Sequence, residues 1–232
     1  MSKYSILTIG YKSLENIKNR IEEAYKFANP DEFIVIINYY SEESWKILDY
    51  VKNEPKVTRY CFSSQNMGFS KAINLAYKIS KNDHLIMLSD DCSVRGNSYK
   101  LLSDALLQDR AGISCVEIGG DHRDCITVPK GFLLGLKKQM IKDCGNYIYD
   151  EVASPLGCER ELAYRAKSKN YDVVLAKGCE YSHSYDISSN PSRIINYLGE
   201  NMSPQGVNPF QFESEKKLLQ LIEQHKIAIT NK

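Results

Sequence analysis

The first part of the chain alternates between short apolar runs and segments with helical spacing, and this order restricts the fold more than any other feature. The runs at 33–37 and 85–88 are almost continuously apolar, which is typical of strands buried on both faces of a parallel sheet. Alternating strands and helices predict an α/β fold with a mostly parallel central sheet and helices on both faces. The expected strands are 4–9, 33–38, 57–62 and 84–89, and the expected helices are 14–28, 42–53 and 68–80.

The second half of the chain is less regular. After Tyr185 the composition becomes typical of a loop or lid, followed by an amphipathic helix near 212–228. We therefore expect one main domain over 1–185 and a small C-terminal extension over 186–232. Before the extension, the pattern predicts helices at 97–108, 137–143 and 159–169, and strands at 112–118, 131–136, 172–176 and 180–183.

The composition restricts which classes of partner and which location are expected. Thirty Lys and Arg face 29 Asp and Glu, a net charge of +1, whereas a dedicated nucleic-acid binder carries a basic excess, so no nucleic-acid partner is expected. No apolar run approaches the ~20 residues of a transmembrane segment, and the start lacks the apolar region of a signal peptide. Seven scattered cysteines without a CxxC pair indicate free thiols in a reducing compartment, which predicts a cytoplasmic location.

Two adjacent acids follow the apolar run at 84–88. Ser89, Asp90 and Asp91 come directly after this predicted strand, and ligands of such sheets bind beyond the carboxyl ends of the strands. Neighbouring carboxylates repel each other unless a cation or hydrogen-bond donors compensate them. A divalent ion that bridges a diphosphate would resolve the repulsion. The plainer alternative is a solvated turn that begins the next helix.

A second segment combines a glycine with a predicted helix start. Asn66, Gly68, Phe69 and Lys71 lie between a strand and the helix at 68–80. Glycine permits close approach of the backbone, and a helix N-terminus attracts anions. Asn74 lies inside this helix and either contacts the same ligand or orients the loop. The plainer alternative is an ordinary turn at the start of a helix.

The third segment carries a candidate base and a candidate ligand. Glu159 and Glu161 do not share a helix face because they are two residues apart. One can point into a cleft while the other holds the scaffold, and Glu159 at the helix start is our candidate general base. His183 ends a strand-like run and is a candidate metal ligand or nucleotide contact. The alternatives are a structural histidine and a glutamate that complements the helix dipole.

In this order, these segments resemble the family 2 glycosyltransferases of the GT-A fold, in particular the bacterial rhamnosyltransferase-like branch. The resemblance covers roughly residues 4–185 and implies a nucleotide-sugar half at about 1–96 and an acceptor half at about 97–185. The segments that carry it are INYYSEES (37–44), NMGFSKAINLA (66–76), LSDDC (88–92), YDE (149–151), CERELAYR (158–165) and YSH (181–183).

The resemblance implies an inverting, metal-dependent hexosyltransferase of the kind that serves polysaccharide biosynthesis. It would move a sugar from a UDP-, dTDP- or GDP-linked donor to a hydroxyl of a glycan or other acceptor. Asp91 and His183 would hold Mn²⁺ or Mg²⁺, and Glu159 would deprotonate the acceptor. The residues implied to contact the donor are Thr8, Gly10, Tyr11, Asn38, Asn66, Gly68, Phe69, Lys71, Asn74, Ser89 and Asp90.

The sequence departs from the family pattern at three positions. Ser89 replaces the first acid of the D-x-D motif, Cys158 with Glu159 replaces Glu-Asp, and Asn38 replaces the base-reading Asp. A catalytically degenerate GT-A domain that binds sugar or protein is therefore an alternative. A sugar nucleotidyltransferase is less favoured, because the loop at 9–13 contains one glycine where such enzymes are glycine-rich. The sequence leaves a homo-oligomer open.

Overall fold

The computed structural model describes residues 3–11, 13–39, 41–117, 129, 131–151 and 158–183. The extension expected at 186–232, with its lid and its helix near 212–228, lies outside the described residues. Among the described helices, none is long and apolar enough to cross a membrane.

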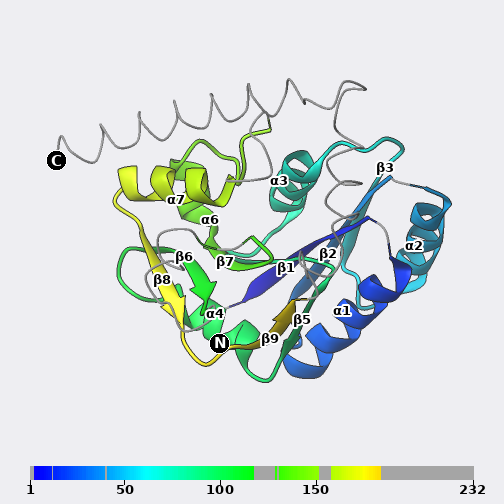
Figure 1. Ribbon diagram of the computed structural model, residues 1–232, viewed down its shortest axis with the longest axis horizontal. Coiled ribbons are helices and arrows are strands. Elements are labelled where there is room, and N and C mark those ends of the chain that lie inside the picture. The colour runs from blue at the N-terminus through cyan, green and yellow to red at the C-terminus, as the bar shows by residue number, and fades with distance from the viewer. Residues whose placement is uncertain are drawn as a thin grey trace, which may run out of the picture.

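Within the described part of the chain, a seven-stranded sheet forms the centre of the fold. Its strands are β1 (Tyr4–Gly10), β2 (Glu32–Asn38), β3 (Arg59–Ser63), β4 (His84–Leu88), β6 (Ala111–Val116), β7 (Leu133–Lys137) and β8 (Asp172–Ala176). They lie in the order β3-β2-β1-β4-β7-β6-β8 (Figure 1). All neighbours pair in parallel except β7, which runs antiparallel to β4 and β6. The expected mostly parallel α/β fold is confirmed.

Helices cover both faces of the sheet. They are α1 (Leu14–Phe27), α2 (Glu42–Asn53), α3 (Phe69–Ile79), α4 (Ser98–Ala105), α6 (Lys138–Asp143) and α7 (Cys158–Ser168). One buried cluster joins α3, α6 and α7 to the sheet, and a second joins α1, α2 and α4 to the opposite face. Figure 1 shows α3, α6 and α7 above the sheet. Ser13 caps α1, because its Oγ accepts the Asn16 N–H at 3.1 Å.

A second, two-stranded sheet was not expected in this form. The short strand β5 (Cys92–Arg95) pairs antiparallel with β9 (Glu180–His183). The segment 89–96 was expected to be a loop, because four residues with alternating exposure carry little strand signal. The partner strand is far away in sequence, so the pairing forms only in the folded chain. It places His183 directly opposite Cys92.

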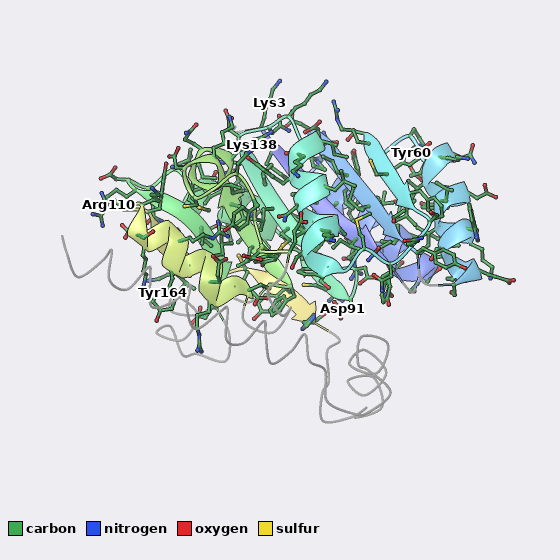
Figure 2. All side chains as sticks on the ribbon, turned by 90° about the horizontal axis from the view of Figure 1, so that it is seen from above. Lys3, Tyr60, Asp91, Arg110, Lys138 and Tyr164 are labelled. Carbon is green, nitrogen blue, oxygen red and sulfur yellow. The ribbon has the colours of Figure 1, made fainter. Side chains whose placement is uncertain are left out.

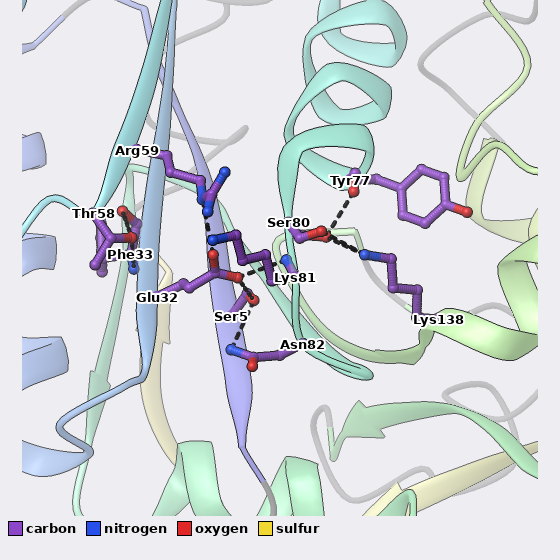
Figure 3. A network of polar contacts seen from close by, with 10 residues as sticks. All are labelled: Ser5, Glu32, Phe33, Thr58, Arg59, Tyr77, Ser80, Lys81, Asn82 and Lys138. Carbon is purple, nitrogen blue, oxygen red and sulfur yellow. Dashed lines mark hydrogen bonds and ion pairs between the residues drawn. The ribbon is translucent and has the colours of Figure 1, made fainter.

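The amino ends of the parallel strands are tied together by a polar network (Figure 3). Buried Glu32 accepts hydrogen bonds from Ser5 Oγ at 2.6 Å, Lys81 N at 2.7 Å and Arg59 Nε at 2.9 Å. Burial alone raises the pKa of Glu32, but these donors outweigh it and lower the pKa below its ordinary value. A hollow of 360 Å³ lies beside this carboxylate. Since these partners of Glu32 all belong to the protein itself, the network joins strands at the edge opposite the candidate site.

An ion pair inside α7 holds the segment before that helix. The Arg165 guanidinium donates to the Glu161 carboxylate at 2.5 and 2.9 Å, and to the carbonyls of Cys144 and Ile148 at 2.6 Å each. Both side chains are at most 4% exposed. Glu161 is thus the scaffold member of the pair of glutamates, as the sequence suggested for one of the two.

Asn74 of α3 holds the same segment from the other side. Its Oδ1 accepts the N–H groups of Ile148 and Tyr149 at 2.8 and 3.1 Å, and its Nδ2 donates to the Tyr149 carbonyl at 2.8 Å. Asn74 is 1% exposed. These bonds go to the segment before α7 and not to the loop at the start of α3, and the expected contact of Asn74 with the donor stays a prediction.

Replacing Arg165 tests the buried pair. In Arg165→Leu the Glu161 carboxylate stays buried without its partner, so we expect the free energy of unfolding in urea to fall by about 3–5 kcal/mol. Arg160→Leu removes an exposed arginine from the same helix and should change it by less than ~0.5 kcal/mol. Equal losses in the two variants would contradict the structural role of Arg165.

Candidate functional site

The candidate site lies where β1, β2 and β4 end. In a parallel sheet these carboxyl ends meet at one edge, and the loops that follow them come together there. The structure places Gly10 at the end of β1 with Tyr11 directly after it, Asn38 at the end of β2, and Asp91 after β4. Figure 2 shows Asp91 at this edge, beside β9.

Asp91 and His183 lie next to each other, as the sequence analysis required. His183 Nε2 is 3.2 Å from Asp91 Oδ1, and Ser89 Oγ donates to the same oxygen at 2.5 Å. The two side chains are 27% and 21% exposed, so a ligand can reach both. The β5–β9 pairing creates this contact, since it brings His183 opposite Cys92, the residue after Asp91.

The two acids have different environments. Burial raises the pKa of Asp91, but the hydrogen bonds from His183 and Ser89 outweigh this effect and lower the pKa below its ordinary value. Burial, with the charge of Asp91 added, raises the pKa of Asp90 to about 7, against the opposing charge of Arg20. Two carboxylates held this close oppose each other's ionisation, and a cation relieves that repulsion.

The chemistry of this pair fits a divalent ion. Carboxylate oxygen and imidazole nitrogen are both common ligands of divalent metals in proteins. Among the described residues, no group of three or more His, Cys, Asp or Glu side chains is arranged to hold a metal. Asp91 and His183 stay the predicted ligands of such a cation.

Arg20 and Glu23 of α1 support the acidic loop and were missed by sequence reasoning. Buried Arg20 pairs with Glu23 at 3.0 Å. Glu23 in turn accepts hydrogen bonds from Ser93 Oγ at 2.8 Å and from Val94 N at 3.2 Å. These bonds tie α1 to β5, directly after the acids. No signal marked them, because a charged pair on a helix ordinarily faces solvent.

Asn38 connects three of the predicted loops. Its Oδ1 accepts the Met67 N–H at 2.9 Å, and its Nδ2 donates to Asn66 Oδ1 at 2.8 Å. Asn66 also accepts the Gly68 N–H at 2.9 Å and donates to the Tyr11 hydroxyl at 3.1 Å. The network brings these predicted residues together. The expected contact of Asn38 with a base stays a prediction.

The start of α3 has the geometry that the glycine suggested. Gly68 has φ +79°, and an added Cβ would meet nothing within 4 Å, so conformation rather than space requires glycine here. Lys71 is exposed. Phe69 points inward and lies 5.7 Å from the Tyr149 ring. Of these residues, Gly68 and Lys71 are therefore the ones that solvent or a ligand can approach.

Thr8 and Gly10 lie at the buried end of β1. Thr8 is fully buried, and its Oγ1 has no hydrogen-bond partner among the described residues. A Cβ at Gly10 would lie 3.2 Å from Ile47 Cγ2 and 3.5 Å from Ile17. Glycine there lets α1 and α2 pack closely on the strand. The expected role of both residues in lining a nucleotide pocket stays a prediction.

Glu159 is the second residue of α7, and its carboxylate lies over a glycine. A Cβ at Gly131 would be only 2.1 Å from Glu159 Oε1, so the carboxylate occupies the space that any other residue's side chain would fill. Burial, followed by the charge of Glu159, raises the pKa of both the Cys158 thiol and the Tyr149 phenol well above their ordinary values. The carboxylate therefore lies beside apolar, buried groups.

The next residue, Phe132, connects this carboxylate to the metal candidates. Its ring stacks on the His183 imidazole, with centroids 4.3 Å apart and planes 16° apart. Its carbonyl accepts the Ser89 N–H at 2.8 Å. Glu159, His183 and Ser89, whose hydroxyl donates to Asp91, therefore all contact one dipeptide, Gly131–Phe132. The sequence analysis placed this dipeptide only in an apolar strand and missed its role at the site.

Comparison with solved structures identifies the fold. The mannosyltransferase PcManGT from Pyrobaculum calidifontis, in complex with GDP-Man and Mn²⁺, superposes with a TM-score of 0.64 at 12% identity over 99% of this chain and 74% of its own. S. aureus TarS in complex with UDP-GlcNAc superposes with a TM-score of 0.61 at 15% identity, over 81% of this chain and 61% of its own. GalNAc-T7 with UDP, GalNAc and Mn²⁺ superposes with a TM-score of 0.66 at 14% identity, over 79% of this chain and 44% of its own. The chain thus spans less than two thirds of the latter two.

Comparison of sequences identifies the family. No curated protein sequence matches the chain. The family model described as glycosyl transferase family 2 matches residues 5–143, which include the acidic loop and the Gly131–Phe132 dipeptide but end before Glu159 and His183. This match covers more than half of the chain and agrees with the observed sheet and its site edge. The chain belongs to glycosyl transferase family 2.

Proposed function

We propose that the protein transfers a sugar from a nucleotide-diphosphate sugar to a hydroxyl group, with a divalent metal and inversion at the anomeric carbon. The observation that carries this proposal is the contact of Asp91 with His183 at the carboxyl edge of the sheet, 3.2 Å apart. A carboxylate and an imidazole at this edge, in a member of this family, suit a bound diphosphate with its metal.

Asp91 and His183 would hold the ion, which is Mn²⁺ or Mg²⁺ in this proposal. When bound, the ion neutralises charge on the diphosphate as it leaves. Ser89 supports this assignment although it replaces an acid of the D-x-D motif. Its hydroxyl donates to Asp91 Oδ1 at 2.5 Å and so fixes the carboxylate that remains.

Glu159 would be the general base. It accepts the proton of the acceptor hydroxyl while that oxygen attacks the anomeric carbon from the face opposite the diphosphate. A single in-line displacement of this kind inverts the configuration. The carboxylate must be ionised to accept this proton, and its placement beside the acidic loop is the observation that supports its role. The contact with Gly131 and the link through Phe132 to His183 support that placement.

The donor half of the protein would be about residues 1–96 and the acceptor half about residues 97–185, with the extension 186–232 as a C-terminal lid or loop and helix. The similar structures were solved with GDP-Man, with UDP-GlcNAc and with UDP and GalNAc. Two of them also contain Mn²⁺. We therefore propose a UDP-, GDP- or dTDP-linked donor. A rhamnosyltransferase-like activity remains part of the proposal.

Nucleotide binding can be measured first, by thermal unfolding with UDP, GDP and dTDP in the presence of MnCl₂. A ligand at 100 times its Kd stabilises the native state by about 2.7 kcal/mol, which raises Tm by roughly 5–10 °C for a chain of this size. Asp91→Asn should abolish the shift of the preferred nucleotide, because a charged ligand of the metal is lost. The exposed control Asp109→Asn should keep it. An unchanged shift in Asp91→Asn would contradict the role of Asp91.

Removal of the base should separate chemistry from binding. Glu159→Gln keeps the size of the side chain but cannot accept the proton, so transfer should fall by roughly 10²–10⁴-fold while the nucleotide shift persists. The control Glu22→Gln changes an exposed glutamate of α1 and should have wild-type activity. Full activity of Glu159→Gln rules this base out. Wild-type protein that binds nucleotide but never consumes a donor sugar identifies the degenerate, binding-only alternative.

A further inference from the structure

We propose that Gly131 and Phe132 are positioning residues that set the Glu159 carboxylate and the His183 imidazole relative to the Asp91 loop. The inference rests on the proposed function and deepens it, because it names the element that relates the base to the metal ligands. Neither residue carries an acid, a base or a metal ligand, so both act through the side chains that they contact.

Gly131 acts on Glu159 through the absence of a side chain. An added Cβ would lie 2.1 Å from Oε1, 2.9 Å from Cδ and 3.1 Å from Cγ of Glu159. Gly131 is not among the residues with positive φ, so the backbone itself accepts alanine. The group in the way is the end of a flexible side chain. A substitution therefore displaces the carboxylate rather than the main chain.

Phe132 acts on His183 through its ring. The two rings are nearly parallel, 16° apart, with centroids at 4.3 Å. This stacking fixes the plane of the imidazole while Nε2 points to Asp91 Oδ1 at 3.2 Å. The Phe132 ring also packs against the Tyr181 ring, with centroids 5.4 Å apart. The Tyr181 hydroxyl in turn donates to the Glu117 carbonyl at 2.6 Å.

The main chain of Phe132 connects both contacts to the acidic loop. Its carbonyl accepts the Ser89 N–H at 2.8 Å, which extends the β4–β7 ladder by one residue beyond the Leu88–Leu133 pair. Consecutive Cα atoms are ~3.8 Å apart across a trans peptide. The base and the imidazole therefore contact neighbouring residues of the turn that leads into β7, and that peptide relates their positions.

The Gly131 arm uses a compensating pair of variants. In Gly131→Ala we expect donor turnover, measured with UDP-GlcNAc and GDP-mannose plus MnCl₂, to fall by about 100-fold, because a misplaced catalytic group costs that much. The binding of UDP or GDP with Mn²⁺ should be unchanged. Glu159→Asp shortens the base by one methylene, so Gly131→Ala/Glu159→Asp should be as active as Glu159→Asp alone. General damage to the fold by Gly131→Ala would lower turnover in the single variant and, relative to Glu159→Asp, in the double variant as well. If Gly131→Ala loses turnover and Glu159→Asp does not compensate for it, the proposal for Gly131 is overturned.

The Phe132 arm has a readout that does not need activity. In wild-type protein without metal, the Phe132 ring should shift the His183 ring protons upfield in the NMR spectrum, with assignment from His183→Gln. Phe132→Leu should move these signals downfield and weaken Mn²⁺–nucleotide binding by about 10-fold, and Phe132→Tyr should restore both. Phe27→Leu, at the far end of α1, is the matched control. Unchanged His183 signals or unchanged binding in Phe132→Leu overturn the proposal for Phe132.

These two sets of experiments distinguish failure of the positioning role from failure of the proposed function. If wild-type protein binds and turns over a donor but the variants behave like wild type, the positioning role is wrong and the proposed function stands. If wild-type protein neither binds a nucleotide nor consumes a donor, the proposed function is wrong. The inference then falls with it, even where the NMR signature of the stacked rings is present.

Discussion

The antiparallel pairing of β5 with β9 is the interaction on which the candidate site depends. It joins the strand that follows Asp91 to the strand that ends at His183, and so makes the 3.2 Å contact between carboxylate and imidazole. Only four residues on each side take part, and α1 reinforces the strand through Glu23. Without this pairing, Asp91 would lie at the edge of an ordinary α/β sheet with no second ligand beside it.

Acids that are close in sequence lie in different environments because they are buried to different extents and have different partners. Hydrogen bonds from His183 and Ser89 hold Asp91 in its charged form, whereas burial raises the pKa of its neighbour Asp90 to about 7. At the second helix, Glu161 is neutralised inside the scaffold by Arg165. Glu159, two positions earlier, instead occupies the space above Gly131. The two acids of this helix thus lie in different environments, and Glu161 is the one that stabilises the fold.

Much of the fold was predictable because its signals are local. Continuous apolar runs identified β2 and β4, and helical spacing with a Ser13 cap identified α1. The antiparallel direction of β7 and the strand β5 were not identified, since neither follows from periodicity in a short segment. Arg20, Glu23, Gly131 and Phe132 were missed at the site for a similar reason: their roles consist of contacts with distant residues. Asn38, Asn66 and Asn74 were found, but their hydrogen bonds in the structure go to loops.

The sequence by itself determined most of the order of strands and helices, and it predicted the edge of the sheet where ligands would bind and most of the polar groups that gather there. It could do so because apolar periodicity and the polarity of parallel strands are properties of short segments. Tertiary structure alone decided which of these groups touch. The Asp91–His183 pair and the Gly131–Glu159 contact join residues far apart in the chain, and such contacts depend on how several buried faces pack at once, which no local pattern encodes.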